Sequence, residues 1–197
     1  MGVKILGVSG SMRADSNSVR ALRVVLEAAE ARGAETRLLD LYEIDLPVYR
    51  PQGAEDTGGT LAADAAVNWA EALVLASPDY HGSMSGAMKN FLDYFWEEFA
   101  GKLFGYLCAS HERGLTVMDQ MRTAVRQCYG WSLPYGVAVH PKEDFDQTTN
   151  AYSPAVTRRL QMLARDITVY GELITAQFRR DLAGDAADTF AARYRKK

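Results

Sequence analysis

The sequence has few cysteines, little net charge and no long apolar run. Its two cysteines, Cys108 and Cys128, have neither the spacing of a metal site nor that of a redox motif. The 22 basic and 25 acidic residues give a net charge of −3, which provides no electrostatic footprint for nucleic acid or a membrane surface. No apolar stretch approaches the roughly 18 residues that a membrane-spanning helix needs, and the N-terminal residues do not resemble a signal peptide. We therefore expect a cytoplasmic protein with reduced cysteines that binds no metal, nucleic acid or membrane.

The glycine-rich phosphate motifs are also missing from the first loop. An apolar run at Val3–Val8 stops at the polar segment Ser9–Ser18, and glycine occurs in this stretch only at Gly7 and Gly10. Neither G-x-G-x-x-G nor G-x-x-x-x-G-K-[ST] fits this pattern. A site that presses backbone against a pyrophosphate is therefore not expected here.

This first loop is instead rich in hydroxyl groups. It contains four serines, one asparagine and one arginine, and a helical pattern follows it at once. Hydroxyls gathered at a helix N-terminus, where the helix dipole is positive, form a pocket for an anion. The loop predicts a site for a terminal phosphate group, with Arg13 as a charged contact. The alternative is a solvated loop in which Ser16 or Ser18 only caps the helix.

The rest of the chain alternates strand-like and helical patterns, which favours one α/β domain over residues 1–197 with a parallel sheet covered on both faces. The five expected strands are Val3–Val8, Glu35–Leu41, Ala72–Ala76, Leu103–Ala109 and Tyr135–His140. The expected helices are Val19–Ala31, Leu61–Trp69, Ser85–Phe99, Val117–Tyr129 and Pro154–Phe178. The weakly patterned tail from about residue 184 is expected to be loosely ordered. In such sheets ligands bind at the carboxyl ends of the strands, so the segments that follow the strands are the candidate sites.

Two of these segments are informative. After the third expected strand, Pro78 ends the strand's hydrogen bonding, Tyr80 and His81 offer ring faces and polar edges, and Gly82 permits close approach of a flat ligand. His81 is either a proton-transfer group or an ordinary hydrogen-bonded histidine.

After the fourth expected strand, Ser110 and His111 are expected to point toward the same rim. No cluster of histidine, cysteine and carboxylate has metal-ligand spacing. His140, at the end of the fifth expected strand, is interpreted as a loop residue.

The expected helix Ser85–Phe99 is unusually aromatic. It carries five aromatic residues within nine positions: Phe91, Tyr94, Phe95, Trp96 and Phe99. One core-facing stripe covers only about 100° of a helix, so some of these rings are expected to face a partner or a ligand. This favours a homodimer or homotetramer that uses the helix, and the alternative is that all five rings pack inside.

Together these segments resemble a known family. The paired motifs are Gly10-Ser11-x-Arg13-x-x-Ser16-x-Ser18 and Ser77-Pro78-Asp79-Tyr80-His81-Gly82-Ser83-x-x-Gly86-x-x-Lys89-Asn90-x-x-Asp93. They are similar to those of the NAD(P)H-dependent FMN reductases of flavodoxin-like fold, over most of the chain from Val3 to roughly Val139. The resemblance implies a flavodoxin-like three-layer sandwich with FMN as cofactor and NADPH or NADH as co-substrate.

The resemblance also implies a set of cofactor-binding residues. The FMN phosphate would be held by Ser11, Arg13, Ser16, Asn17 and Ser18. The flavin ring and ribityl chain would be lined by Pro78, Asp79, Tyr80, His81, Gly82, Ser83, Ser110 and His111. The family commonly has Glu and Asn at positions 79 and 81, and a glycine-rich loop where this chain has Ser110–Gly114.

The implied function is a ping-pong oxidoreductase in which FMN passes hydride from NAD(P)H to a flavin, a quinone or a similar flat acceptor. No protein nucleophile is required, because the flavin carries the chemistry. Two alternatives remain: a non-enzymatic electron carrier like a flavodoxin, and a phosphate-ligand sensor on the same fold.

Overall fold

A parallel β-sheet forms the middle layer of the protein. The computed structural model describes residues 2–44, 46–53 and 57–195. The sheet has the strand order β2-β1-β3-β4-β5, and β6 also pairs with β4. Its strands are β1 (Lys4–Ser9), β2 (Glu35–Asp40), β3 (Ala72–Pro78), β4 (Leu103–Ala109), β5 (Trp131–Ser132) and β6 (Val137–Val139). The predicted α/β fold with a parallel sheet is confirmed.

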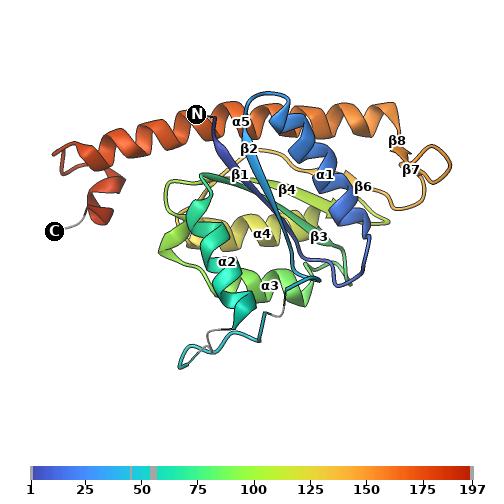
Figure 1. The fold of residues 1–197 in the computed structure, drawn as a ribbon, viewed down its shortest axis with the longest axis horizontal. Coiled ribbons are helices and arrows are strands. Elements are labelled where there is room, and N and C mark those ends of the chain that lie inside the picture. Colours follow the sequence, from blue (N-terminus) through green and yellow to red (C-terminus); the bar gives the residue numbers. More distant parts are fainter. Residues whose placement is uncertain (1, 45, 54–56, 196–197) are drawn as a thin grey trace.

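Helices cover both faces of the sheet (Figure 1). They are α1 (Asn17–Glu30), α2 (Gly58–Trp69), α3 (Gly86–Asp93), α4 (Leu115–Gln127) and α5 (Pro154–Ala183), with short 3₁₀ turns η1 (Glu97–Phe99) and η2 (Phe190–Tyr194). Because successive strand residues point to opposite faces, Ile5 packs with α1 and α5, whereas Leu6 packs with α2, α3 and α4. The result is the predicted three-layer sandwich.

The fifth strand position is divided, which differs from the single strand expected at Tyr135–His140. β5 pairs with the start of β4 and β6 pairs with its end. Between them lies Pro134, which has no N–H to donate to a ladder. Gly136 also approaches its neighbours closely, because a Cβ atom there would lie 2.5 Å from the sulfur of Met118.

The aromatic segment is not one helix, so the expectation for Ser85–Phe99 is wrong in part. α3 ends at Asp93, and the chain turns before η1. Three rings spaced four residues apart form a single buried stripe that reaches β4, with centroid distances of 5.1 Å for Phe91–Phe95, 5.7 Å for Phe95–Phe99 and 4.9 Å for Phe99–Phe104. Trp96 is 64% exposed. The aromatic excess that suggested a partner therefore reduces mainly to this tryptophan.

The C-terminal tail also differs from the expectation of loose order. α5 continues to Ala183, and η2 then folds back so that Ala191 is buried. The Arg195 guanidinium donates to the backbone oxygen of Asp181 at 2.6 Å. Lys196 and Lys197 lie outside the described residues. Among the helices of the described ranges, none combines the length and apolarity needed to cross a bilayer.

Candidate functional site

The loop between β1 and α1 forms a cradle at the carboxyl edge of the sheet. Ser16 caps the helix, since its Oγ accepts the Val19 N–H at 3.2 Å. The remaining amides of a first helical turn have no acceptor within the helix and can bind an anion. Ser11 and Ser18 are buried beside them at 2% exposure each, whereas Arg13 is exposed. Ser16 therefore caps the helix, as the second interpretation of the loop expected. The phosphate site at the other donors of the cradle stays a prediction.

Two polar side-chain atoms in this cradle have no hydrogen-bond partner among the described residues. They are the hydroxyl of Ser18 and the amide oxygen of Asn17, and both atoms are buried. A buried polar group without a partner costs about 1–3 kcal/mol. Unpartnered groups at the mouth of a helix are what a ligand with phosphate and hydroxyl groups would satisfy, so the cradle fits a phosphorylated ligand.

Arg20 and Asp15 form an ion pair at the rim of the cradle. The Arg20 Nη2 lies 2.5 Å from Asp15 Oδ2. The hydrogen bond from Arg20 lowers the pKa of Asp15, so this carboxylate stays charged. The pairing leaves Arg13 and Lys142 as lining cations without an ion-pair partner in the described part of the chain.

Asp79 ties the loops after β3 and β4 together. Its Oδ1 accepts the Gly82 N–H at 2.8 Å, and its Oδ2 accepts the Ser110 hydroxyl at 2.8 Å. His81 and Gly82 have φ angles of 58° and 76°, and Tyr80 and Ser83 exchange backbone hydrogen bonds of 3.0 and 3.1 Å around them. This tight turn, with two left-handed residues, places Tyr80 and His81 at the sheet edge.

A hairpin that the sequence did not predict braces the cradle. Its strands β7 (Phe145–Asp146) and β8 (Ala151–Tyr152) pair antiparallel after the fifth strand position. The Tyr152 hydroxyl donates to the backbone oxygen of Asn17 at 3.2 Å, and Arg20 lies 5.0 Å above the Phe145 ring. Burial raises the pKa of Tyr152 to about 12, so its hydroxyl keeps the proton that it donates.

Replacing Tyr152 with phenylalanine tests this brace. The ring keeps its packing against Phe145 but loses the hydrogen bond to Asn17. We expect a loss of about 0.5–1.5 kcal/mol in the free energy of unfolding, the usual net value of one hydrogen bond. Urea unfolding measures this loss. A variant as stable as the parent protein would show that the hairpin packs on the cradle without bracing it.

Ten of the thirteen predicted site residues line one cavity of about 420 Å³. They are Ser11, Arg13, Ser16, Asn17, Ser18, Pro78, Asp79, Tyr80, Ser110 and His111. The other three lie elsewhere. His81 and Gly82 line an adjoining cavity of about 460 Å³ that shares Asp79, Ser110 and His111 with the first. Ser83 faces the groove between α3 and α4, where its hydroxyl donates to Gln120 at 2.9 Å.

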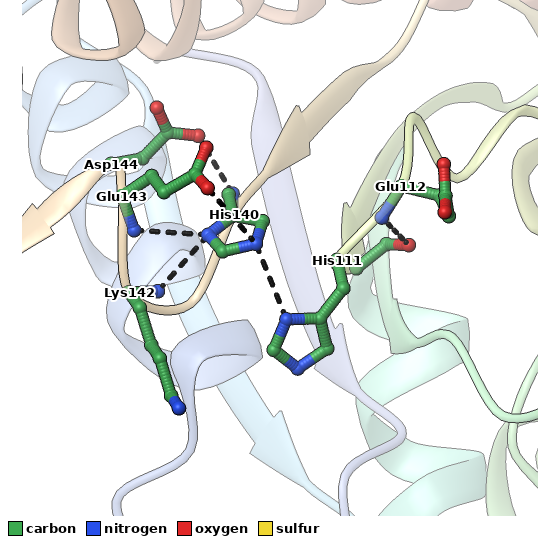
Figure 2. A network of polar contacts seen from close by, with 7 residues as sticks. His111, Glu112, His140, Lys142, Glu143 and Asp144 are labelled. Atoms are coloured by element: carbon green, nitrogen blue, oxygen red, sulfur yellow. Dashed lines mark hydrogen bonds and ion pairs between the residues drawn. The ribbon is translucent and has the colours of Figure 1, made fainter.

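Sequence reasoning missed several residues that line the first cavity, among them Arg20, Lys142 and Gln147. Lys142 follows the fifth expected strand, so the rule that ligands collect at strand ends would have found it. Gln147 lies in the loop of the hairpin, within the polar run Asp146–Asn150, which is a turn signal that the sequence analysis did not use. His140 is also more than a loop residue, since its Nε2 lies 3.2 Å from Nδ1 of His111 (Figure 2).

The sequence is similar to those of known flavin reductases. Residues 3–144 match the family described as NADPH-dependent FMN reductase. An NAD(P)H-dependent FAD/FMN reductase of Geobacillus thermodenitrificans is 24% identical over 173 residues, covering 84% of this chain and 91% of that protein. An NADPH azoreductase of Bacillus sp. is 30% identical over 109 residues, covering 53% of this chain and 61% of that protein.

Solved structures share the fold. FerB of Paracoccus denitrificans, a flavoenzyme NAD(P)H:(acceptor) oxidoreductase, superposes with a TM-score of 0.73 at 19% identity, over 87% of this chain and 98% of that one. At this identity the likeness concerns the architecture alone.

Proposed function

This chain belongs to the NADPH-dependent FMN reductase family, and we propose from that premise that it is an FMN-dependent NAD(P)H oxidoreductase that reduces a flat small molecule by a ping-pong mechanism. The observation that carries the proposal is the cradle at the first loop. It combines a helix N-terminus, buried serines with an unpartnered hydroxyl and the unpaired cation Arg13. These are the groups that a phosphate monoester requires.

We propose roles for the residues that line this cavity. We assign the FMN phosphate to Ser11, Arg13, Ser18 and the first amides of α1. The loops after β3 and β4 would hold the ring, with Tyr80, Ser110 and His111 at its edge. Ser83 is less available to contact the ring, because its hydroxyl already donates to Gln120.

Bound FMN would supply the redox chemistry by taking hydride from NAD(P)H and giving electrons to the acceptor. The protein residues then need only to bind the flavin, to orient its ring and to exclude competing contacts. Tyr80 is 45% exposed and stands at the open rim, where a second flat molecule would approach the ring. A flavin, a quinone or, as the azoreductase relative suggests, an azo compound has the flat shape that this opening would accept.

We also propose that the chain acts as a homodimer or homotetramer through the segment Ser85–Phe99. The exposed Trp96 is the side chain of this segment that supports the proposal, because large exposed aromatics are enriched at interfaces.

The test is titration of the purified protein with FMN, followed by stopped-flow mixing with NADPH. We expect a flavin spectrum that co-purifies or reconstitutes, and rapid bleaching of the bound flavin by NADPH. A second mixing step with a quinone should restore the oxidised spectrum. A protein that binds FMN but is reduced negligibly by NADPH and by NADH would be an electron carrier. A protein that stays colourless would contradict the flavin assignment altogether.

A further inference from the structure

The turn after β6 fixes the proton position on the imidazole of His140. The backbone N–H groups of Lys142 and Glu143 both approach its Nδ1, at 3.3 and 2.9 Å. Backbone N–H groups can only donate, so Nδ1 must be the unprotonated, accepting nitrogen. The Asp144 carboxylate accepts the backbone N–H of His140 at 2.7 Å and closes the turn. His140 is therefore neutral and carries its proton on Nε2.

This proton position determines that of His111. The Nε2 of His140 lies 3.2 Å from Nδ1 of His111, with the two rings edge to face at a centroid distance of 4.9 Å. Since His140 must donate, Nδ1 of His111 must accept. A neutral imidazole has a single N–H, and the proton of His111 is consequently on Nε2. Two backbone amides thus set the tautomer of a side chain on a different loop.

The Nε2–H group of His111 points away from His140. Figure 2 shows its second ring nitrogen on the side opposite the His140 contact. The residue lines both the 420 Å³ cavity and the adjoining 460 Å³ cavity. Its neighbour Ser110 is buried and bonded to Asp79, which holds the backbone of this loop in place. The His140 side chain is 19% exposed, so it stands behind His111.

We propose that His140 is a positioning residue that fixes His111 as a hydrogen-bond donor toward the ligand cavity. This inference rests on the proposed function and deepens it. The donor would select a ligand atom that accepts, such as a carbonyl oxygen or an unprotonated nitrogen on the edge of FMN. A neutral donor at that edge favours the more electron-rich state of the ring, so the pair would bias bound FMN toward reduction.

The tautomers are tested on the unliganded protein by imidazole ¹⁵N spectroscopy. We expect both histidines to show a protonated Nε2 and a bare Nδ1. A spectrum in which Nδ1 of His111 carries the proton would overturn the inference. The experiment contains no FMN, so its outcome does not depend on whether the proposed function is correct.

Variants of His140 test its effect on the ligand. His140→Leu removes the donor, and we expect FMN to bind about fivefold more weakly. Its reduction potential should fall by about 30 mV, a tenfold weaker preference for the reduced form. His140→Gln, whose side-chain amide retains an N–H at the Nε2 position, should recover most of both effects.

The matched control is Glu143→Gln, since this carboxylate lies 3.9 Å from Nε2 of His140 and its side chain is 80% exposed. We expect its FMN affinity and potential to equal those of the parent protein. If the leucine and glutamine variants of His140 shift the potential equally, or if Glu143→Gln shifts it as much as His140→Leu, the donor is not set by His140 and the inference fails.

Discussion

Replacing Arg13 with alanine is expected to weaken FMN binding about 10- to 100-fold. A hydrogen bond between charged groups contributes about 1.5–3 kcal/mol, and each 1.4 kcal/mol is a factor of ten in affinity. Arg13 is exposed and has no ion-pair partner within the described residues. Its loss should therefore leave the melting temperature unchanged. Calorimetric titration with FMN and a thermal scan of the unliganded protein measure the two quantities.

The matched control for this prediction is Arg23→Ala. Arg23 is an exposed cation on α1 that does not line the cavity. Arg23→Ala removes the same charge, but from α1 rather than from the loop that precedes it. It therefore separates contact with the phosphate from a general electrostatic effect. Arg13→Lys retains the charge but loses the planar fork, and we expect an intermediate affinity. If Arg13→Ala and Arg23→Ala weaken FMN binding equally, Arg13 is not a contact of the phosphate.

Substitutions of Ser18 are expected to change stability and binding in opposite directions. Ser18→Ala removes a buried hydroxyl that has no partner in the described chain. The unliganded protein should become more stable by up to about 1 kcal/mol, at the low end of the penalty for an unsatisfied buried group. FMN binding should nevertheless weaken several-fold, because the hydroxyl would donate to the phosphate. This trade-off is typical of a residue kept for a ligand rather than for the fold.

Ser18→Asp is expected to have the larger effect. A carboxylate in the first turn of a helix interacts favourably with the helix dipole, which offsets part of the cost of placing a charge at this buried position. Within the cradle the same carboxylate would repel a phosphate, and we expect more than about a 100-fold loss of FMN affinity from several kcal/mol of like-charge repulsion. Circular dichroism checks the fold and calorimetry the binding. A Ser18→Asp variant that is folded and binds FMN with parent affinity would place the phosphate elsewhere.

Much of the fold could be predicted from local patterns. The first, third and fourth strands were found because apolar runs mark strands buried on both faces, and the second, Glu35–Leu41, because its residues alternate. Ten of the proposed site residues share a cavity because parallel strands bring their carboxyl ends to one edge. The divided fifth position could not be predicted in this way, since it depends on the close packing of Gly136 against Met118 and on Pro134 interrupting the ladder.

The aromatic segment shows a different limit of sequence reasoning. Five rings in nine residues suggested a surface for a partner. In the structure Phe91, Phe95 and Phe99 lie on one buried stripe, and the Tyr94 hydroxyl donates to the backbone oxygen of Pro47 at 2.8 Å. The composition gives the number of aromatic side chains in a segment, but the path of the backbone determines which of them contact one another.

Local sequence patterns predict the layer architecture and the loops proposed to face a ligand, because the period of apolar residues and the residue types at strand ends act over a few neighbouring positions. Tertiary structure alone decided the rest. It brought Tyr152 to Asn17, which are 135 positions apart, and His140 to His111, which are 29 positions apart. The position of the proton on His111 depends on the turn that begins at His140, which the residues next to His111 in the sequence do not determine. A hydrogen bond forms only where the tertiary structure brings a donor and an acceptor together.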